Sequence, residues 1–370
     1  MDLVRFPVSA IVGILLSASL HAQTVSTFAG SGMPGLIDGP PRTAQFHRPT
    51  WLDVDPVDGT VYVVDRANHR LRRITSDGTV TTLFPEEPEW LTPRPAALDF
   101  GGPFGGGIAV EPPESGCAGA FFGPGMFVSS TAGHQLHFLA DVRWLNRTGY
   151  ALRDNASPVI GTGIPGSADG TQITASFNSP GDVALSWDYK PSYFARFQHA
   201  AVYIADISNN SVRRIRFRYT DDFCGQPYYV DTLATGFNAP RGVAAAPDGS
   251  VYVADTGNHA IRRIAPDGTV TTVVAEGLNS PSGIDVNAFG EVFIADTGNY
   301  VVRKLTADGR LITIAGTPGV AGYVDGPALT ARFSGPIGVR VYGNTVYIAD
   351  TANNVIRKLE MPPRRRATRH

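Results

Sequence analysis

The stretch Val251–Val273, VYVADTGNHAIRRIAPDGTVTTV, recurs in variant form along the whole chain and constrains the fold more than any other feature. Its apolar residues alternate as the two faces of a strand require, and Asp-Gly signals a tight turn between strands. In repeat architectures each unit buries its apolar face only against its neighbours. The chain is therefore expected to consist of copies of one antiparallel unit.

The central part of the unit occurs six times. The copies are VYVVDRANHRLRRI (61–74), MFVSSTAGHQLHFL (126–139), VYIADISNNSVRRI (202–215), VYVADTGNHAIRRI (251–264), VFIADTGNYVVRKL (292–305) and VYIADTANNVIRKL (346–359). A Phe-x-x-Pro element and a short run of small apolar residues precede the copies, as expected of an innermost strand, with Leu278 in place of Phe in the fifth. An outer strand such as TVTTV completes a four-stranded meander. Six such units predict an all-β, six-bladed β-propeller.

The two ends of the repeat region complete one another. The sixth copy stops after its third strand near Glu360, whereas Thr24–Gly30, TVSTFAG, looks like an outer strand without a blade of its own. Joining them closes the ring and removes an exposed strand edge. We therefore assign one propeller domain to residues 24–360.

These residues resemble the NHL-repeat family, through YVADTGNH-IRRI followed by DGTVTTV. The resemblance covers roughly residues 24–360 and implies a six-bladed propeller. A longer spacer recurs at 29–46, 161–177 and 315–333. It is similar to the linker of many exported NHL-repeat proteins.

The N-terminus has the layout of a secretory signal peptide. Arg5 is followed by an apolar run from Val8 to Leu20 and by small residues near Ala22, so residues 1–22 are predicted to be removed. The apolar run is shorter than the ~20 residues that span a bilayer. A secreted or periplasmic location follows. Residues 361–370, with four arginines after two prolines, are predicted to form a disordered basic tail.

Polar residues that recur in the blades are expected to serve folding. The Asp after the second strand should cap the turn and pair with the Arg seven residues later. The pairs are Asp65 and Arg72, Asp206 and Arg213, Asp255 and Arg262, Asp296 and Arg303, and Asp350 and Arg357. In blade two, Ser130 and His137 replace both partners together. The repeated His69, His134 and His259 are spread around the ring and do not point to one shared centre. The spacer residues Asp38, Asp169 and Asp325 are likewise repeated, and an oxygen-rich cation loop there is a minor alternative to a role in folding.

Residues that differ between blades are the better candidates for function. The second residue of each Phe-x-x-Pro element should lie in a ring at the mouth of the central channel: Asn178, Asn238 and Asn279, with His47, Gly101 and Ser334. Just inside come Trp51, Asp182, Arg241, Asp285 and Arg340. Concave sites with a few convergent polar groups often bind small ligands. Two alternatives stay open, a ligand site at this mouth or a hydrated channel.

Blades two and three carry four inserts, at 111–125, 140–155, 186–200 and 216–230, which should all emerge on the opposite face. Their aromatic residues, including Trp144, Trp187, Tyr189, Tyr193, Phe194, Tyr228 and Tyr229, suggest a partner surface, although packing of the inserts against the propeller is an equal alternative. Cys117 and Cys224 also lie there, as a disulfide or as two thiols.

Two functional hypotheses follow from the sequence. The first is an exported, monomeric, non-catalytic scaffold without a cofactor, which binds a protein, peptide or carbohydrate. The second is a propeller lyase or lactonase, as in related six-bladed families, in which Asp182, Asp285 and an Asn hold one divalent cation. His47 alone near the axis cannot form a three-histidine zinc site. Acidic and basic residues nearly balance, 33 against 31, so no nucleic-acid partner is expected.

Overall fold

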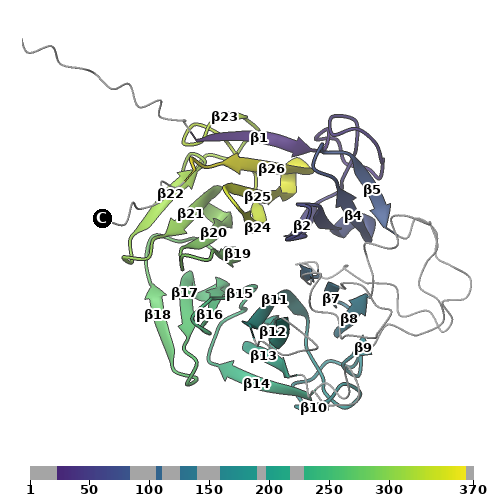
Figure 1. Cartoon of the computed structure of the whole chain (residues 1–370), viewed down its shortest axis with the longest axis vertical. Coiled ribbons are helices and arrows are strands. Elements are labelled where there is room, and N and C mark those ends of the chain that lie inside the picture. The colour runs from purple at the N-terminus through teal and green to yellow at the C-terminus, as the bar shows by residue number, and fades with distance from the viewer. Residues whose placement is uncertain are drawn as a thin grey trace, which may run out of the picture.

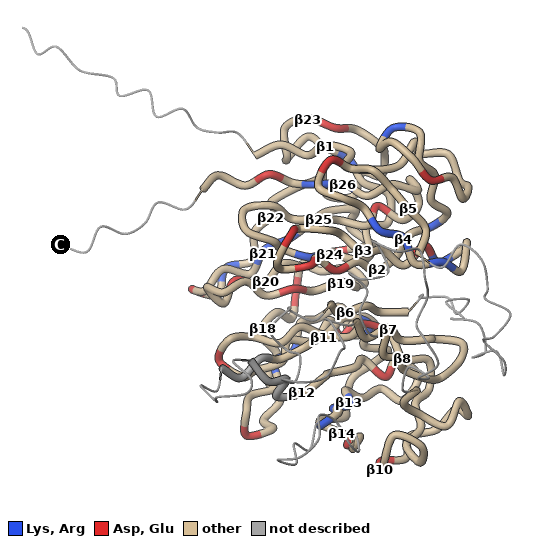
Figure 2. Tube along the Cα trace, turned by 45° about the vertical axis from the view of Figure 1, so that its right-hand side comes forward, with Lys and Arg blue, Asp and Glu red and all other residues tan. Residues whose placement is uncertain are grey.

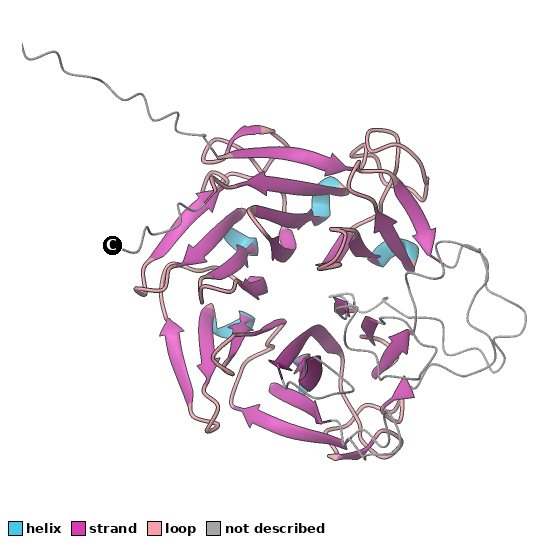
Figure 3. Cartoon of the chain, viewed as in Figure 1, coloured by secondary structure: helices cyan, strands magenta, loops and turns pink. Residues whose placement is uncertain are grey.

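The computed structural model describes residues 23–83, 106–110, 126–139, 159–189, 197–216 and 229–363. Six antiparallel sheets surround a central axis like the blades of a propeller (Figure 1). Apart from short 3-10 turns, the described regular structure is all strand (Figure 3). The predicted six-bladed, all-β propeller is confirmed. None of the helices within these ranges is long and apolar enough to cross a membrane.

Each blade runs from an inner to an outer strand. Blade one contains β2 (Pro49–Val54), β3 (Val61–Asp65), β4 (Arg70–Ile74) and β5 (Val80–Leu83), and blade two contains β6 (Ile108–Val110), β7 (Met126–Ser130), β8 (Gln135–Leu139) and β9 (Val159–Ile160). Blade three contains β11 (Pro180–Tyr189), β12 (Phe197–Asp206), β13 (Ser211–Arg216) and β14 (Tyr229–Thr235). Blade four contains β15 (Gly242–Ala245), β16 (Val251–Asp255), β17 (Ala260–Ile264) and β18 (Val270–Val274). Blade five contains β19 (Pro281–Val286), β20 (Val292–Asp296), β21 (Val301–Leu305) and β22 (Leu311–Ala315).

Blade six joins the two ends of the chain. Its inner three strands are β24 (Pro336–Tyr342), β25 (Thr345–Asp350) and β26 (Val355–Glu360), and its fourth is β1 (Thr24–Ala29). β1 runs antiparallel to β26, with Thr24 opposite Glu360 and Val25 opposite Leu359 (Figure 1). The spacers add a fifth short strand to two blades, β10 (Gly170–Thr171) in blade three and β23 (Gly326–Pro327) in blade six, which the repeat pattern did not predict.

The core lies between neighbouring blades. Ala254 and Ile261 of blade four, for example, pack in one cluster with Ile284 and Ile294 of blade five. Towards the axis the inner strands approach one another so closely that a Cβ added at Gly242 would overlap the carbonyl oxygen of Ser282 in the next blade. Glycine at this position therefore allows the ring to close tightly around its axis.

The repeated Asp and Arg form the predicted structural pair, but the expected cap is wrong: none of the five Asp side chains accepts a capping hydrogen bond from a backbone N–H of the 3-10 turn that it precedes. Asp65 is fully buried; its Oδ1 accepts the backbone N–H of His47 (2.7 Å), and its Oδ2 accepts bonds from Asn68 (2.8 Å) and Arg72 (2.7 Å). Ion pairs at the other four predicted sites have N···O distances of 2.8 to 3.4 Å. One carboxylate thus ties the third strand to both the turn and the Phe-x-x-Pro element.

In blades one, three and six the spacer supplies a second carboxylate to the same arginine. Asp38 lies 2.8 Å from Arg72, Asp169 lies 2.9 Å from Arg213, and Asp325 lies 2.6 Å from Arg357. The repeated spacer aspartates are therefore partners of buried guanidinium groups. The three arginines in these blades have no solvent exposure.

Two of the three repeated histidines join neighbouring blades. Nδ1 of His134 accepts the backbone N–H of Ser179 (3.0 Å), and Nδ1 of His259 accepts that of Ser280 (2.9 Å). Asn210 accepts the equivalent N–H of Ala239 through its side-chain oxygen (2.8 Å). These residues lie in separate blades and serve the contact between them.

Candidate functional site

Arg340 extends from β24 of blade six across the propeller axis and is the centre of a buried polar cluster. Its Nη2 donates to Oδ1 of Asp182 (3.1 Å) and to the carbonyl oxygen of Val183 (3.2 Å), both in blade three. Its Nη1 donates to the carbonyl oxygen of Ile284 in blade five (3.0 Å), and its Nε lies 3.3 Å from Oδ1 of Asp53 in blade one. One side chain therefore contacts three other blades.

The carboxylates around Arg340 also join each blade to the next. Oδ2 of Asp53 accepts the N–H of Val110 in blade two (2.6 Å), and Oδ2 of Asp285 accepts that of Val341 in blade six (2.7 Å). Asp182 makes a longer bond of the same kind to Val243 in blade four (3.3 Å). Alternate blades thus supply an aspartate that bonds to the inner strand of the following blade.

Burial dominates the electrostatics of this cluster. It raises the pKa of Asp182 to about 7 and that of Asp285 to about 6, and it also raises the pKa of Asp53, while the charge of Arg340 opposes all three shifts. Burial alone would lower the pKa of Arg340, but the surrounding carboxylates outweigh it and raise that pKa. Three carboxyl groups share one guanidinium, so protons can reside within the cluster near neutral pH.

Asp182→Asn is expected to make the pH dependence of stability shallower. A carboxyl group whose pKa rises from 3.8 to about 7 on folding stabilises the folded state below about pH 4. That contribution is lost as the pH rises through about 7. Melting temperatures of the wild type should therefore fall more steeply than those of the variant across this interval. Parallel melting curves for the two proteins would contradict the assignment.

The structure groups the predicted channel residues differently from the sequence pattern. It brings Asp182, Asp285 and Arg340 together with Asp53, which the sequence analysis missed. Asp53, Asp285 and Arg340 each stand four residues after the proline of their inner strand, so alignment of the inner strands alone could have found Asp53. The other two predicted channel residues are Trp51 and Arg241. Trp51 is buried. Arg241 is half-buried, and burial lowers its pKa to about 10.

The predicted ring at the channel mouth has a structural role through its backbone. The N–H groups of His47, Asn178, Asn238, Asn279 and Ser334 each donate to the repeated Asp of their own blade, at 2.7 Å in every case. The side chains of Asn238 and Asn279 are exposed, and those of His47, Asn178 and Ser334 are partly buried. Gly101 lies outside the described residues.

The described ranges contain no group of three or more His, Cys, Asp or Glu arranged to hold a metal ion. Arg340 occupies the space between the axial carboxylates. The proposed cation ligands Asp182 and Asp285 each direct an oxygen at a backbone N–H of the next blade.

Much of the predicted aromatic surface lies outside the described residues, including Trp144, Tyr193, Phe194, Tyr228 and the cysteines Cys117 and Cys224. Trp187 and Tyr189 lie on β11, opposite His199 and Phe197 of β12, so the ends of insert 186–200 continue the blade-three hairpin. Tyr229 begins β14, is 46% exposed, and lies under the guanidinium of Arg216, 5.9 Å from its ring centre.

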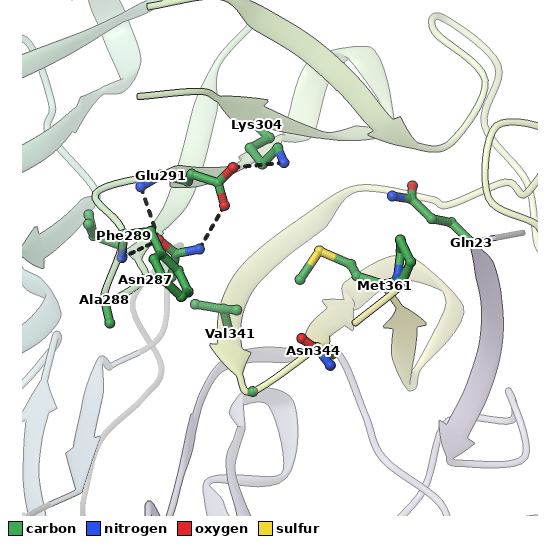
Figure 4. A pocket seen from close by; sticks show the side chains of 12 residues that line it. Gln23, Asn287, Ala288, Phe289, Glu291, Lys304, Val341, Asn344 and Met361 are labelled. Atoms are coloured by element: carbon green, nitrogen blue, oxygen red, sulfur yellow. Dashed lines mark hydrogen bonds and ion pairs between the residues drawn. The ribbon is translucent and has the colours of Figure 1, made fainter. Parts of the chain in front are cut away.

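A pocket of about 390 Å³ lies between blades five and six, at the ends of the strands remote from the 3-10 turns (Figure 4). The turn between β19 and β20 forms one side, with Asn287, Phe289 and Glu291. Asn344, in the turn between β24 and β25, and Met361 form the other. The repeat pattern does not predict this pocket, because its unusual residues stand in a turn that is otherwise regular.

Comparison with known proteins gives one matching family and distant relatives. Residues 237–264 match the model of the NHL repeat. The chain is similar to the chloroplast protein SUPPRESSOR OF QUENCHING 1 of Arabidopsis thaliana, with 25% identity over 350 residues. This match covers 90% of the chain but only 26% of that protein, so the chain spans about a quarter of its relative.

Two solved structures represent two functional classes with a similar fold. An auxiliary nutrient binding protein from Bacteroides thetaiotaomicron has a TM-score of 0.58 and 18% identity, covering 91% of this chain and 76% of that one. A gluconolactonase from Xanthomonas campestris has a TM-score of 0.53 and 15% identity, covering 93% of each. At these identities the similarity concerns the fold alone.

Proposed function

We propose that this chain, an NHL-repeat β-propeller, acts as an exported, non-catalytic scaffold that binds a protein, peptide or carbohydrate. The observation that carries the proposal is that the axial cluster, which consists of Arg340, Asp53, Asp182 and Asp285, makes hydrogen bonds and ion pairs between blades. Arg340 bonds to three other blades, and each axial aspartate bonds to the blade that follows it. Groups that hold the ring together in this way would have to release structural bonds to take part in acid-base chemistry.

The surface supports the same proposal. The pocket between blades five and six is bordered by residues that depart from the repeat, and the blade-three hairpin extends beyond the ordinary blade. Regular positions maintain the propeller, whereas irregular ones are free to be selected for a ligand. A rigid ring that presents variable edges is well suited to binding.

The scaffold function is tested with a purified variant of the chain in which two glycines replace residues 186–200. A partner is first captured with the wild-type chain and identified. If the aromatic inserts bind this partner, we expect the deletion variant not to capture it. The melting temperature of the variant should stay close to that of the wild type. Asp248→Ala, in the exposed turn of blade four, is the control. Unchanged capture by the deletion variant would reject this surface.

A lyase or lactonase with one divalent cation is the second candidate. The raised pKa values of Asp182 and Asp285 favour it, because carboxyl groups that titrate near neutral pH often mark catalytic sites. Metal analysis of the dialysed protein distinguishes the two candidates. One stoichiometric divalent ion that is lost in Asp285→Asn or Asp182→Asn would support the enzyme and overturn the scaffold.

A further inference from the structure

We propose that the pocket between blades five and six is a binding site for a neutral carbohydrate. This inference rests on the scaffold function proposed above and gives its ligand a chemical class. The pocket has a volume of about 390 Å³, within the range of about 300–1,000 Å³ that is usual for small-molecule sites.

The hollow arises from a difference in turn length. In blade five, five residues from Asn287 to Glu291 connect the paired residues Val286 and Val292. In blade six, four residues connect Val341 and Val346, which also pair directly. The shorter turn leaves space beside the longer one, and Met361 after β26 borders it (Figure 4).

An internally compensated ion pair favours a ligand without net charge. Nζ of Lys304 lies 3.0 Å from Oε1 of Glu291, and both side chains are largely buried. The side-chain amide of Asn287 donates to Oε2 of Glu291 (2.8 Å), and its oxygen accepts the N–H groups of Phe289 and Glu291. The carboxylate is therefore fixed in place, and an anionic or cationic ligand would meet a like charge at close range.

The pocket offers hydrogen-bond donors and acceptors together. Among the described residues, no hydrogen bond uses the side-chain amides of Gln23 and Asn344. Each amide presents a donor and an acceptor side by side, and Lys304 has ammonium hydrogens beyond the one directed at Glu291. A sugar hydroxyl donates and accepts at once, so adjacent hydroxyls match such groups.

Apolar side chains between these polar groups suit the C–H faces of a sugar ring. Phe289 is 62% exposed, and Met361, Val286 and Val341 are partly buried. Aromatic rings provide large, rigid contact area. The combination of an exposed ring, amides and a neutral ion pair distinguishes this pocket from a purely apolar groove.

The residues that form the site are departures from the repeat. Phe289 stands where blades one and four have Asp58 and Asp248 before the turn glycine. Glu291 stands where those blades have Thr60 and Ser250. Folding of the turn does not require either change, because the equivalent hairpins form with the usual residues.

The test measures binding of the full-length chain to a panel of neutral oligosaccharides of two to six hexose or pentose units. Matched oligosaccharides that contain uronic acids or amino sugars, and a set of short peptides, are included. We expect neutral oligosaccharides to bind best. Phe289→Ala and Asn344→Ala should each weaken that binding by about tenfold, because both side chains are exposed and their loss removes direct contacts. Asp248→Ala, at the position equivalent to Phe289, should bind like the wild type.

Binding of neutral oligosaccharides that is unchanged in both pocket variants would overturn this site. Absence of binding, or preferential binding of the charged sugars or peptides, would overturn the carbohydrate assignment. Melting curves of Phe289→Ala and Asn344→Ala identify any loss of folding. Glu291→Gln is a further variant that keeps the shape of the side chain while removing its ion pair with Lys304. If the carbohydrate arm fails while partner capture still depends on residues 186–200, only this inference falls and the scaffold function stands.

Discussion

Asp350→Ala is expected to lower the free energy of unfolding by about 3–5 kcal/mol, because the buried guanidinium of Arg357 then keeps only the partly exposed Asp325 as a charged partner, and two further hydrogen bonds to Asp350 are lost. Arg357 has no exposure, and Nη1 donates to Asp350 over 2.8 Å. Asp350 also accepts bonds from the backbone N–H of Ser334 (2.7 Å) and the amide of Asn353 (2.8 Å). Burial raises the pKa of Asp350 to about 6, so denaturant unfolding is best measured near pH 8.

Asp255→Ala is the matched comparison. Its partner Arg262 is 23% exposed in its side chain and lies 3.4 Å away, so water can replace part of the lost interaction. The loss should be clearly smaller than for Asp350→Ala, although both variants lose the bond to the Phe-x-x-Pro element. Equal losses would show that the turn contacts, and not the buried ion pair, determine the effect.

Arg340→Ala should have the second large effect, and the effect should depend on pH. Without the guanidinium, Asp53, Asp182 and Asp285 face one another across the axis. Only protonation then removes their mutual repulsion and the free-energy cost of burying their charges. Their pKa values, already raised, should rise further, so the variant loses stability as the pH increases through them. We expect a loss of about 3–5 kcal/mol near pH 8, recovered in large part near pH 5.

The double variant Arg340→Ala/Asp182→Asn tests the cause of that loss. Removing one of the competing carboxylates should restore part of the stability near pH 8, and the two substitutions should therefore be non-additive. Strictly additive losses, or a deficit of equal size at both pH values, would mean that Arg340 acts through packing and not through charge.

The repeat made the fold predictable because the blades share the same local sequence signals. Strands with alternating apolar residues, Asp-Gly turns and the Asp–Arg pair recur along the chain. The structure predicted for one unit therefore predicts the other blades and the ring that they form. The exchange of Asp for Ser130 and of Arg for His137 in blade two agrees with this pairing, because both partners change together. His137 is buried, burial lowers its pKa to about 4, and its Nε2 has no hydrogen-bond partner among the described residues. The short strands β10 and β23 were missed because two-residue strands lack periodicity.

The axial cluster was only partly predictable because it depends on how blades meet across the centre. Sequence patterns placed Asp182, Asp285 and Arg340 near the axis, but the reach of Arg340 to blade three is a property of the closed ring. The acidic and basic positions are otherwise interspersed along the described trace (Figure 2). The pocket between blades five and six escaped prediction for a related reason: it results from unequal turns in two blades and has no single sequence motif.

The strand β1 also has a consequence for biogenesis. During synthesis from the N-terminus β1 emerges well before its partner β26, which lies more than 300 residues later in the sequence. Closing so long a loop is entropically slow, so completion of the ring is expected to be a late step in folding. Gln23 and Met361 flank the closing strands and both line the pocket, so a ligand held there would bind only the closed ring and stabilise it against opening.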